Sequence, residues 1–369
     1  MNPCTTNVYI SHGEQHMVTL KEVAQKAGVS PSTASAAIRG MDIVRPDTAK
    51  RVLDTAAKLN YQINMSARAL RSGRTNIYTM LIPDLENQFY AKLANALSNE
   101  LAAHGKRLIV QTNNFKKDKE LEQLAQISAS MCDGVFIAST HNTGREIHEA
   151  LKTFPALLFD DMSPDEDAYY DSIETPSQAG MHALIRHLVS LGRKRIGIVG
   201  TFADNVKPVG KGSPTEIAFA IRQNRYDFAA QAMQAYGLPV DDAFIVSDWS
   251  VNAGIETAHQ LVKQGLRFDA LCCANDDLAL GIIRGLLECG VRVPEDVAVT
   301  GFDGIAPGSF TTPTLTTISS DYQGMAQTAI DMMESQVEQP DEHTMPRRII
   351  VGFQLLQRES TLGFGAGKD

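Results

Sequence analysis

Apolar residues recur every three or four positions in two short stretches near the N-terminus, and this spacing predicts two amphipathic helices. The apolar face of the first helix consists of Leu20, Val23, Ala24 and Ala27. Gly28 ends this helix, and Ser30 with Pro31 opens a second helix after a short turn. The outer face of the second helix carries Ser32, Thr33 and Ser35. Two short helices joined by a glycine-containing turn predict a helix-turn-helix, whose second helix lies in the DNA major groove.

A third helix is predicted to begin at Pro46, because proline suits the first helical position and an apolar stripe follows it. The stripe consists of Val52, Leu53, Ala56 and Leu59. Residues 64–72 (NMSARALRS) are short and weakly helical, and an isolated helix of this length is unstable in water. We expect this segment to become ordered only when another molecule or element holds it.

From Ile77 onward, strand-like apolar runs alternate with helical patterns. The runs are IYTMLIP, RLIVQT, GVFIAS and ALLFD, and later RIGIVG, AFIVSD, ALCCAND and VAVTGFD. Such alternation is typical of parallel sheets covered by helices on both faces. The predicted fold class is therefore α/β, with enough strands for two doubly wound sheets behind a three-helix head.

Polar residues follow four of these runs, and ligands bind beyond the carboxyl ends of strands in open parallel sheets. The residues are Asp160, Asp248 with Trp249, Asn275 with Asp276, and Asp303. Helix capping is the alternative for each one, and we expect Asp276 to cap a helix over 277–289. Carboxylates and amides can hold pairs of hydroxyls, and the single tryptophan, Trp249, can cover the C–H face of a sugar ring or pack in the core.

The length of 369 residues suits two or three domains, and the net charge of −9 is unevenly distributed. Residues 17–76 hold ten Lys/Arg and four Asp/Glu, a net of +6. Glu14 is the only charged residue before them, so the part from Ile77 on carries −14. A basic head on an acidic body fits a head that meets DNA phosphates and a body that does not.

Several classes of protein lack support in the sequence. No stretch approaches the roughly 18 apolar residues of a membrane helix, and residues 1–16 lack the pattern of a signal peptide, so we expect a disordered extension there. The five scattered cysteines favour a reduced cytoplasm. There is no GxSxG, HExxH or Walker motif and no paired histidine spacing, so we expect no catalytic residue, metal or cofactor.

Ordered motifs from Val18 to Phe364 resemble the lactose-repressor (LacI/GalR) family of transcriptional regulators. They include TLKEVAQKAGVSPSTAS and LNYQINMSARALRSGRT in the head, and IPDLENQFY, HLVSLGRKRIGIVG, CANDDLALG, VPEDVAVTGFD and TPTLTTIS in the body. The resemblance implies a cytoplasmic homodimer on near-palindromic operator DNA, usually a repressor of carbohydrate-use genes that a sugar effector releases.

The resemblance also implies a domain layout. A helix-turn-helix domain would span 17–63, a hinge helix and linker 64–76, and a periplasmic-binding-protein-like core 77–369. The first lobe of the core would comprise 77–173 and 320–347, and the second lobe 174–319 and 348–365.

Individual roles follow from the resemblance as well. Predicted phosphate contacts are Thr19, Ser30, Thr33, Ser35 and Asn64, predicted base-reading positions are Pro31, Ser32 and Ala36, and Arg39 is a further predicted DNA contact. Leu70 matches a leucine that enters the minor groove at the operator centre, beside the small residue Ala67. Predicted effector contacts are Phe89 or Tyr90, Asp160, Arg225, Trp249, Asn275 and Asp303.

Three positions depart from the family pattern. Ala36 stands where arginine is common, so we expect the outer bases of each half-site to be read less strictly. Ile63 replaces a proline, so ordering the hinge would cost slightly more conformational entropy. Phe228 stands where a glycine usually follows the arginine, so the assignment of Arg225 rests on its distance to Gly237.

Other functions remain open at this point. A purine or a phosphoprotein co-regulator competes with a sugar within the same class of regulator. A sugar-binding receptor without DNA function would share only the body fold, and an enzyme would need a nucleophile or base that the sequence does not display. No leucine heptads follow Phe364, which favours a dimer over a tetramer.

Overall fold

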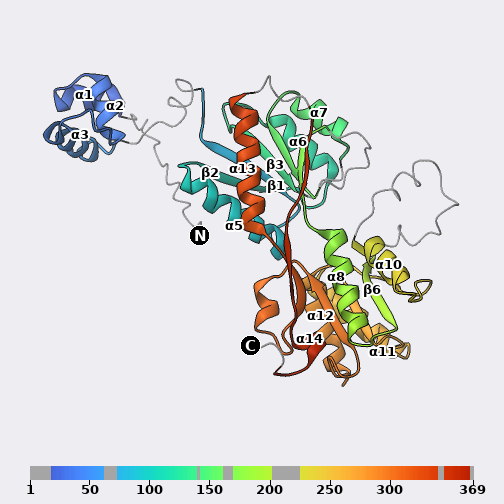
Figure 1. Cartoon of the computed structure of the whole chain (residues 1–369). Coiled ribbons are helices and arrows are strands. Elements are labelled where there is room, and N and C mark those ends of the chain that lie inside the picture. The colour runs from blue at the N-terminus through green and yellow to red at the C-terminus, as the bar shows by residue number, and fades with distance from the viewer. Residues whose placement is uncertain are drawn as a thin grey trace, which may run out of the picture. The chain divides into compact units, whose positions relative to one another are not determined.

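The computed structural model describes residues 18–61, 73–138, 142–160, 169–201, 225–339 and 345–365. The chain divides into two compact units, residues 1–75 and 76–369, which we call the head and the body (Figure 1). The expected N-terminal extension and residues 64–72 of the expected hinge, with Asn64, Ala67 and Leu70, lie outside the described residues, as does Ile63.

The described head consists of three helices, as the apolar spacing predicts. They are α1 (Leu20–Ala27), α2 (Pro31–Ile38) and α3 (Pro46–Lys58). Thr19 and Glu22 form a capping box at the start of α1, and Gly28 ends this helix with φ of +65°, a conformation that favours glycine. The core of the head consists of Val23, Ala24, Ala27, Ala34, Ala37, Val52 and Ala56.

The predicted apolar stripe of α3 is wrong at one position. Val52 and Ala56 are buried four residues apart on one face, whereas the Leu53 side chain is 48% exposed. Successive residues of a helix are rotated by about 100°, so Leu53 turns away from the face that Val52 buries. The core of the head is correspondingly small and rich in alanine.

The body contains two six-stranded sheets that define two lobes. The first sheet has the order β11-β5-β4-β3-β1-β2 and the second β12-β10-β9-β8-β6-β7. The strands of lobe 1 are β1 (Ile77–Ile82), β2 (Arg107–Thr112), β3 (Gly134–Ala138), β4 (Ala156–Phe159), β5 (Asp171–Glu174) and β11 (Arg348–Ile350). Those of lobe 2 are β6 (Ile196–Thr201), β7 (Phe244–Val246), β8 (Ala270–Cys273), β9 (Ala298–Phe302), β10 (Thr316–Ser320) and β12 (Phe353–Leu356). All the strand pairs are parallel except β10 with β12.

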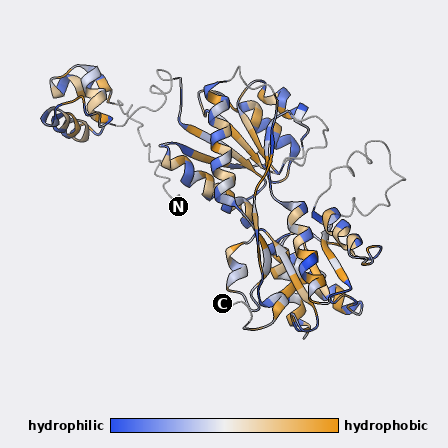
Figure 2. Cartoon of the chain, in the orientation of Figure 1, coloured by the Kyte–Doolittle hydropathy of each residue, from blue (hydrophilic) through white to orange (hydrophobic). Residues whose placement is uncertain are grey.

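Helices pack on both faces of each sheet, as near-continuous apolar strands require. In lobe 1, α5 (Gln88–Ala103) and α13 (Tyr322–Glu338) cover one face, and α6 (Lys117–Gln126) and α7 (Gly144–Leu151) the other. In lobe 2, α8 (Ser177–Ser190) and α10 (Arg225–Ala235) lie opposite α11 (Val251–Lys263) and α12 (Asp276–Glu288). Two short helices, η2 (Ala306–Ser309) and α14 (Glu359–Leu362), complete lobe 2. Figure 2 shows the hydrophobic strands lying between helices of mixed hydropathy.

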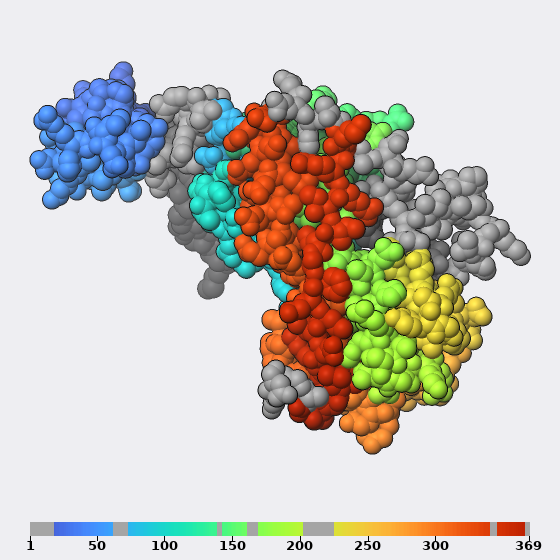
Figure 3. All heavy atoms as spheres, in the orientation of Figure 1, coloured from blue at the N-terminus to red at the C-terminus, as the bar shows by residue number. Residues whose placement is uncertain are grey.

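The chain crosses from one lobe to the other after β5, after β10 and after β11; the next elements are α8, α13 and β12. The predicted boundary before residue 348 is wrong, because β11 pairs with β5 of the first sheet and the chain enters lobe 2 only after Ile350. The guanidinium and backbone N–H of Arg347 both donate to the Asp171 carboxylate, which holds this segment on lobe 1. Figure 3 shows α13 on the surface of lobe 1 and the C-terminal segment continuing from lobe 1 onto lobe 2.

Among the described helices, none is both long and apolar enough to cross a membrane.

Close packing of α11 against α12 generates a stability prediction. A Cβ atom on Gly281 would overlap the backbone carbonyl oxygen of Val251, whereas one on Gly352 would meet no atom within 4 Å. We expect Gly281→Ala to lower the free energy of unfolding by about 1–3 kcal/mol, because two helix backbones would have to separate. Urea unfolding followed by the fluorescence of Trp249, the single tryptophan, measures this. Gly352→Ala is the matched control, and equal stability of the two variants would contradict the packing.

Candidate functional site

The start of α2 presents short polar side chains to solvent. Pro31 and Ser32 are exposed, and Ser30 caps the helix by accepting a hydrogen bond of 3.1 Å from the Thr33 backbone N–H. The Ser30 hydroxyl also lies 2.8 Å from the hydroxyls of Ser32 and Thr33. A helix N-terminus with exposed hydroxyls suits contacts to phosphate oxygens and base edges.

Thr19 lies at the start of α1, and its hydroxyl donates to Glu22 at 2.9 Å within the capping box. Ser35 is partly exposed, and the exposed Arg39 donates from Nε to the Ser35 carbonyl oxygen at 3.2 Å. These residues belong to the exposed or half-exposed surface of the head, so each is accessible to DNA.

The structure contradicts the prediction that Ala36 reads base edges. Ala36 is only 4% exposed, and the Met41 N–H donates to its carbonyl oxygen at 3.1 Å. A base-reading side chain must reach solvent, which the Ala36 methyl group does not. The exposed base-reading candidates of α2 are Pro31 and Ser32.

In the body, two predicted carboxylates lie at strand ends on opposite lobes. Asp160 directly follows β4, and Asp303 directly follows β9. Both have positive φ, +44° and +110°, which non-glycine residues rarely adopt and which often marks functional positions. The Asp160 carboxylate accepts hydrogen bonds from the Thr175 backbone N–H at 2.6 Å and from its hydroxyl at 3.2 Å.

Arg225 pairs with Asp303 and lies near Asp160, since its Nη2 is 3.5 Å from the Thr175 hydroxyl that donates to Asp160. Its Nη2 lies 3.1 Å from Oδ1 of Asp303 in an ion pair whose two side chains are 9% and 3% exposed. Nη1 donates to the Ala274 carbonyl oxygen at 2.9 Å, and the guanidinium lies 4.0 Å from the ring centre of Phe302. Arg225, which was assigned from its distance to Gly237, therefore reaches the predicted effector cluster. Phe228, which stands where the family usually has glycine, packs against the core of lobe 2.

Trp249 and Asn275 complete this cluster. The Trp249 ring lies 5.6 Å from the Arg225 guanidinium, and its Nε1–H donates to the Gly200 carbonyl oxygen at 2.6 Å. Asn275 donates from Nδ2 to the Trp249 carbonyl oxygen at 3.1 Å and caps α12 by accepting from the Leu278 N–H at 3.0 Å. Asp248, which precedes Trp249, is exposed.

The prediction that Asp276 caps the following helix is wrong. Asn275 is the N-cap, and α12 begins at Asp276. The Asp276 carboxylate is fully buried and accepts hydrogen bonds from the Thr317 hydroxyl at 2.6 Å and the Ile305 N–H at 2.8 Å. Asp276 thus holds the turn that follows Asp303.

The aromatic pair Phe89 and Tyr90 lies in the first turn of α5, where the two side chains are 4% and 6% exposed. The Phe89 ring centre is 5.8 Å from that of Tyr322, whose hydroxyl donates to the Asp303 carbonyl oxygen at 3.0 Å. Phe89 therefore reaches the cluster through Tyr322.

Sequence reasoning missed Tyr322, Thr175 and Lys92. Thr175 directly follows β5, and Tyr322 comes two residues after β10, so the strand-end rule could have found both. Lys92 lies one turn inside α5, and no strand-end signal marks it.

Burial dominates the electrostatics of the cluster. It raises the pKa of Asp303 to about 7, with Arg225 acting against this rise and the Asp160 charge adding to it. Burial also raises the pKa of Asp160, again opposed by Arg225. Two carboxylates, a guanidinium fork and a tryptophan face together can accept from, donate to and cover a polyhydroxylated ring.

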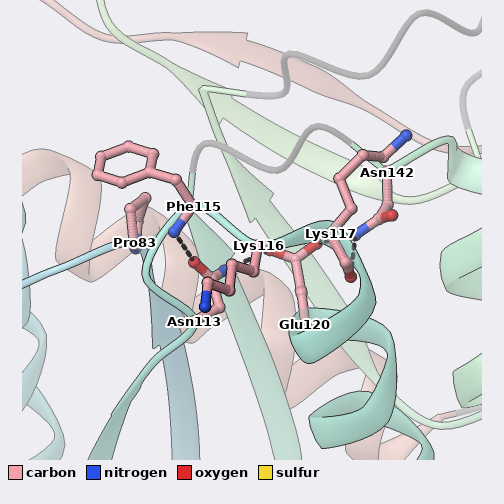
Figure 4. Close-up of a pocket in the computed structure, with 7 residues that line it drawn as sticks. All are labelled: Pro83, Asn113, Phe115, Lys116, Lys117, Glu120 and Asn142. Carbon is pink, nitrogen blue, oxygen red and sulfur yellow. Dashed lines mark hydrogen bonds between the residues drawn. The ribbon is translucent and has the colours of Figure 1, made fainter.

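A small pocket lies on lobe 1 beside the ends of β1 and β2. Figure 4 shows its lining residues, which are Pro83, Asn113, Phe115, Lys116, Lys117, Glu120 and Asn142. The buried Glu120 accepts hydrogen bonds from Nδ2 of Asn113 at 2.6 Å and of Asn142 at 2.7 Å. These bonds tie α6 to the strand ends, and none of the predicted site residues lines the pocket. Across the described ranges, no group of three or more His, Cys, Asp or Glu side chains could hold a metal ion.

Comparisons with known proteins cover both units. The family model for bacterial regulatory proteins of the lacI family matches residues 19–64, and that for a periplasmic binding protein-like domain matches residues 185–361. The HTH-type transcriptional regulator RegA of Clostridium saccharobutylicum is 28% identical over 350 residues, which are 93% of this chain and 99% of RegA.

Solved structures show the same fold. The lac repressor dimer bound to operator and the anti-inducer ONPF has a TM-score of 0.75 at 23% identity, over 94% of this chain and 99% of that one. A LacI family transcriptional regulator from Enterococcus faecium with bound ribose has a TM-score of 0.61 at 24% identity, over 77% and 98%.

A helix-turn-helix head on a two-lobed, periplasmic-binding-protein-like core defines a DNA-binding transcriptional regulator. The chain belongs to the LacI family of bacterial regulatory proteins.

The raised pKa of Asp303 generates a prediction of pH dependence. The folded protein holds this proton more tightly than the unfolded chain, whose aspartates titrate near pH 4. The resulting stabilisation is complete below about pH 4 and is lost as the pH rises through about 7. We therefore expect the free energy of unfolding to fall between pH 5 and pH 8, and this fall to be smaller by on the order of 1–3 kcal/mol in Asp303→Asn.

Denaturant unfolding at both pH values, followed by Trp249 fluorescence, measures the body transition. Asp248→Asn is the control, because Asp248 is exposed. An Asp303→Asn variant with the full wild-type pH dependence would contradict the assignment.

Proposed function

We propose that this regulator is a homodimeric repressor of carbohydrate-use genes that binds near-palindromic operator DNA and is released by a sugar. The observation that carries the sugar assignment is the convergence of Asp160, Arg225, Trp249 and Asp303 at the junction of the lobes. Each of these side chains has a role that a polyhydroxylated ring can use: acceptor, donor fork or apolar cover. The ribose bound to the E. faecium relative supports the same class of ligand.

The DNA-binding proposal rests on the exposed start of α2 and on the net charge of +6 in residues 17–76. Thr19, Ser30, Thr33, Ser35 and Arg39 are proposed to contact phosphates, and Pro31 and Ser32 to meet base edges. Asn64, Ala67 and Leu70 keep their proposed operator contacts from the family resemblance. Since DNA is the proposed target, we propose the cytoplasm as the place of action and no catalytic activity.

A dimer is proposed because a near-palindromic operator offers two equivalent half-sites. The lac repressor relative is a dimer on its operator.

The sugar proposal predicts a fluorescence response from a single reporter. Trp249 is the only tryptophan and lies against Arg225, so a bound sugar will change the emission of the whole chain. Titration with D-ribose, D-glucose, D-galactose, D-fructose, cellobiose and sucrose tests this. We expect at least one sugar to give a saturable change, and Arg225→Met and Asp303→Asn to weaken its binding at least tenfold, roughly the loss of a charged hydrogen bond.

Asp248→Asn is the matched control next to the reporter and should bind as the wild type does. A response to none of these sugars, or unchanged binding by Arg225→Met and Asp303→Asn, would count against the site.

The DNA proposal predicts that a negative charge on α2 acts locally. Ser32→Glu places a carboxylate at the proposed DNA surface, so phosphate repulsion should weaken operator binding by at least about tenfold. Ala57→Glu adds the same charge to an exposed position of α3 and should change affinity by less than threefold. Electrophoretic mobility shifts with a palindrome from upstream of the neighbouring genes measure the operator affinity of each variant. The same assay with an isolated half-site measures whether binding needs two half-sites. Equal losses in the two variants would place the DNA surface elsewhere.

A further inference from the structure

Two side chains of lobe 1 bond to consecutive backbone carbonyls of lobe 2. The Tyr322 hydroxyl donates to the Asp303 carbonyl oxygen at 3.0 Å, and Nζ of Lys92 donates to the Gly304 carbonyl oxygen at 2.7 Å. Lys92 belongs to α5 and Tyr322 begins α13, while Asp303 and Gly304 form the turn after β9. We call these two hydrogen bonds the interlobe contact. They join the lobes at the turn that carries the proposed effector carboxylate.

The same turn is fixed from within lobe 2. The Ile305 N–H donates to Asp276 at 2.8 Å, and the Gly304 N–H donates to the Thr317 hydroxyl at 3.3 Å. Gly304 has φ of +64°, and a Cβ there would overlap the Ser319 side chain. Because the turn has so little conformational freedom, a backbone shift at Asp303 moves the two carbonyls together.

The ammonium group of Lys92 has an environment that differs from that of an exposed lysine. Burial lowers the pKa of its ammonium group, and the carboxylates of Asp276 and Asp303 act against this decrease. The ammonium also lies 4.2 Å from the centre of the Tyr322 ring, so the two residues of the interlobe contact support each other. A partly buried charge with these partners makes a stronger hydrogen bond than an exposed one.

The interlobe contact involves the two helices that cover one face of the lobe 1 sheet. Gln323 of α13 donates to Glu100 of α5 at 2.8 Å, and both helices pack on the face of the sheet that contains β1. In sequence, β1 begins at Ile77, directly after the part of the chain that leads from the head.

We propose that Lys92 and Tyr322 are positioning residues that transmit movement of the Asp303 turn to α5 and α13 of lobe 1. The proposal rests on the proposed function in one respect, that a ligand acts on Asp303. A ligand that pulls the Asp303 carboxylate displaces both carbonyls, and the displaced carbonyls pull Lys92 and Tyr322. Lobe 1, which directly follows the head in sequence, responds.

Hydrogen exchange in the full-length, ligand-free protein tests the interlobe contact itself. We expect the Gly304 and Ile305 amides to exchange about tenfold faster in Lys92→Met and in Tyr322→Phe, because each loses one hydrogen bond to the turn. Lys92→Arg keeps a donor and should restore most of the protection. Glu100→Gln is the control, since it alters an α5–α13 bond within lobe 1 without touching the turn.

Variants that melt within a few degrees of the wild type are folded, so their exchange can be compared directly. Wild-type exchange at 304 and 305 in both Lys92→Met and Tyr322→Phe would overturn the interlobe contact. Faster exchange in Glu100→Gln to the same extent would overturn its specificity.

Transmission is tested with the sugar that changes Trp249 fluorescence and with the palindromic operator. We expect Lys92→Met and Tyr322→Phe to keep a saturable Trp249 response to the sugar, while the factor by which saturating sugar weakens operator binding falls at least fivefold. An unchanged factor would overturn the proposal. If none of the tested sugars perturbs Trp249, the proposed function fails, and the exchange experiment still decides whether the interlobe contact exists.

Discussion

The buried ion pair between Arg225 and Asp303 is the constraint on which the body of this regulator depends. Both side chains belong to lobe 2, where they lie close to Asp160 of lobe 1, and they are 9% and 3% exposed. Removing one partner would leave the other charge buried, which is costly, so each side chain holds the other in position. A ligand with hydroxyl groups can bond to these two side chains, because the ion pair presents both a donor and an acceptor.

The charged groups around this ion pair determine which ligands the cluster can bind. Asp160 adds a second carboxylate from lobe 1, and burial holds the pKa of Asp303 at about 7. The cluster therefore holds two carboxylates and one guanidinium among its described residues. A site of this kind favours a neutral, hydroxyl-rich ligand, which supplies donors without adding negative charge.

Strand-end reasoning found much of this site from sequence, because parallel strands present their carboxyl ends at one edge of a sheet. Asp160, Trp249, Asn275 and Asp303 were all identified in this way, and the alternation of apolar runs predicted both sheets. Contacts that depend on how the lobes meet could not be predicted, and Lys92 in the middle of a helix is the clearest case. The roles of Asn275 and Asp276 were confused because both residue types cap helices, and only the packed turn at Ile305 distinguishes them. The burial of Ala36 could not be predicted, because it depends on how the parts of the head pack together.

Reciprocal coupling between sugar and operator is the most direct test of the account. Operator affinity would be measured by fluorescence anisotropy with and without saturating sugar, and sugar affinity by Trp249 fluorescence with and without saturating operator. Linkage requires that the sugar changes the operator dissociation constant by the same factor as the operator changes the sugar dissociation constant. Typical couplings correspond to roughly 5- to 150-fold. The account predicts that each ligand weakens the other by the same factor in this range. Binding of both ligands with no mutual effect would contradict it.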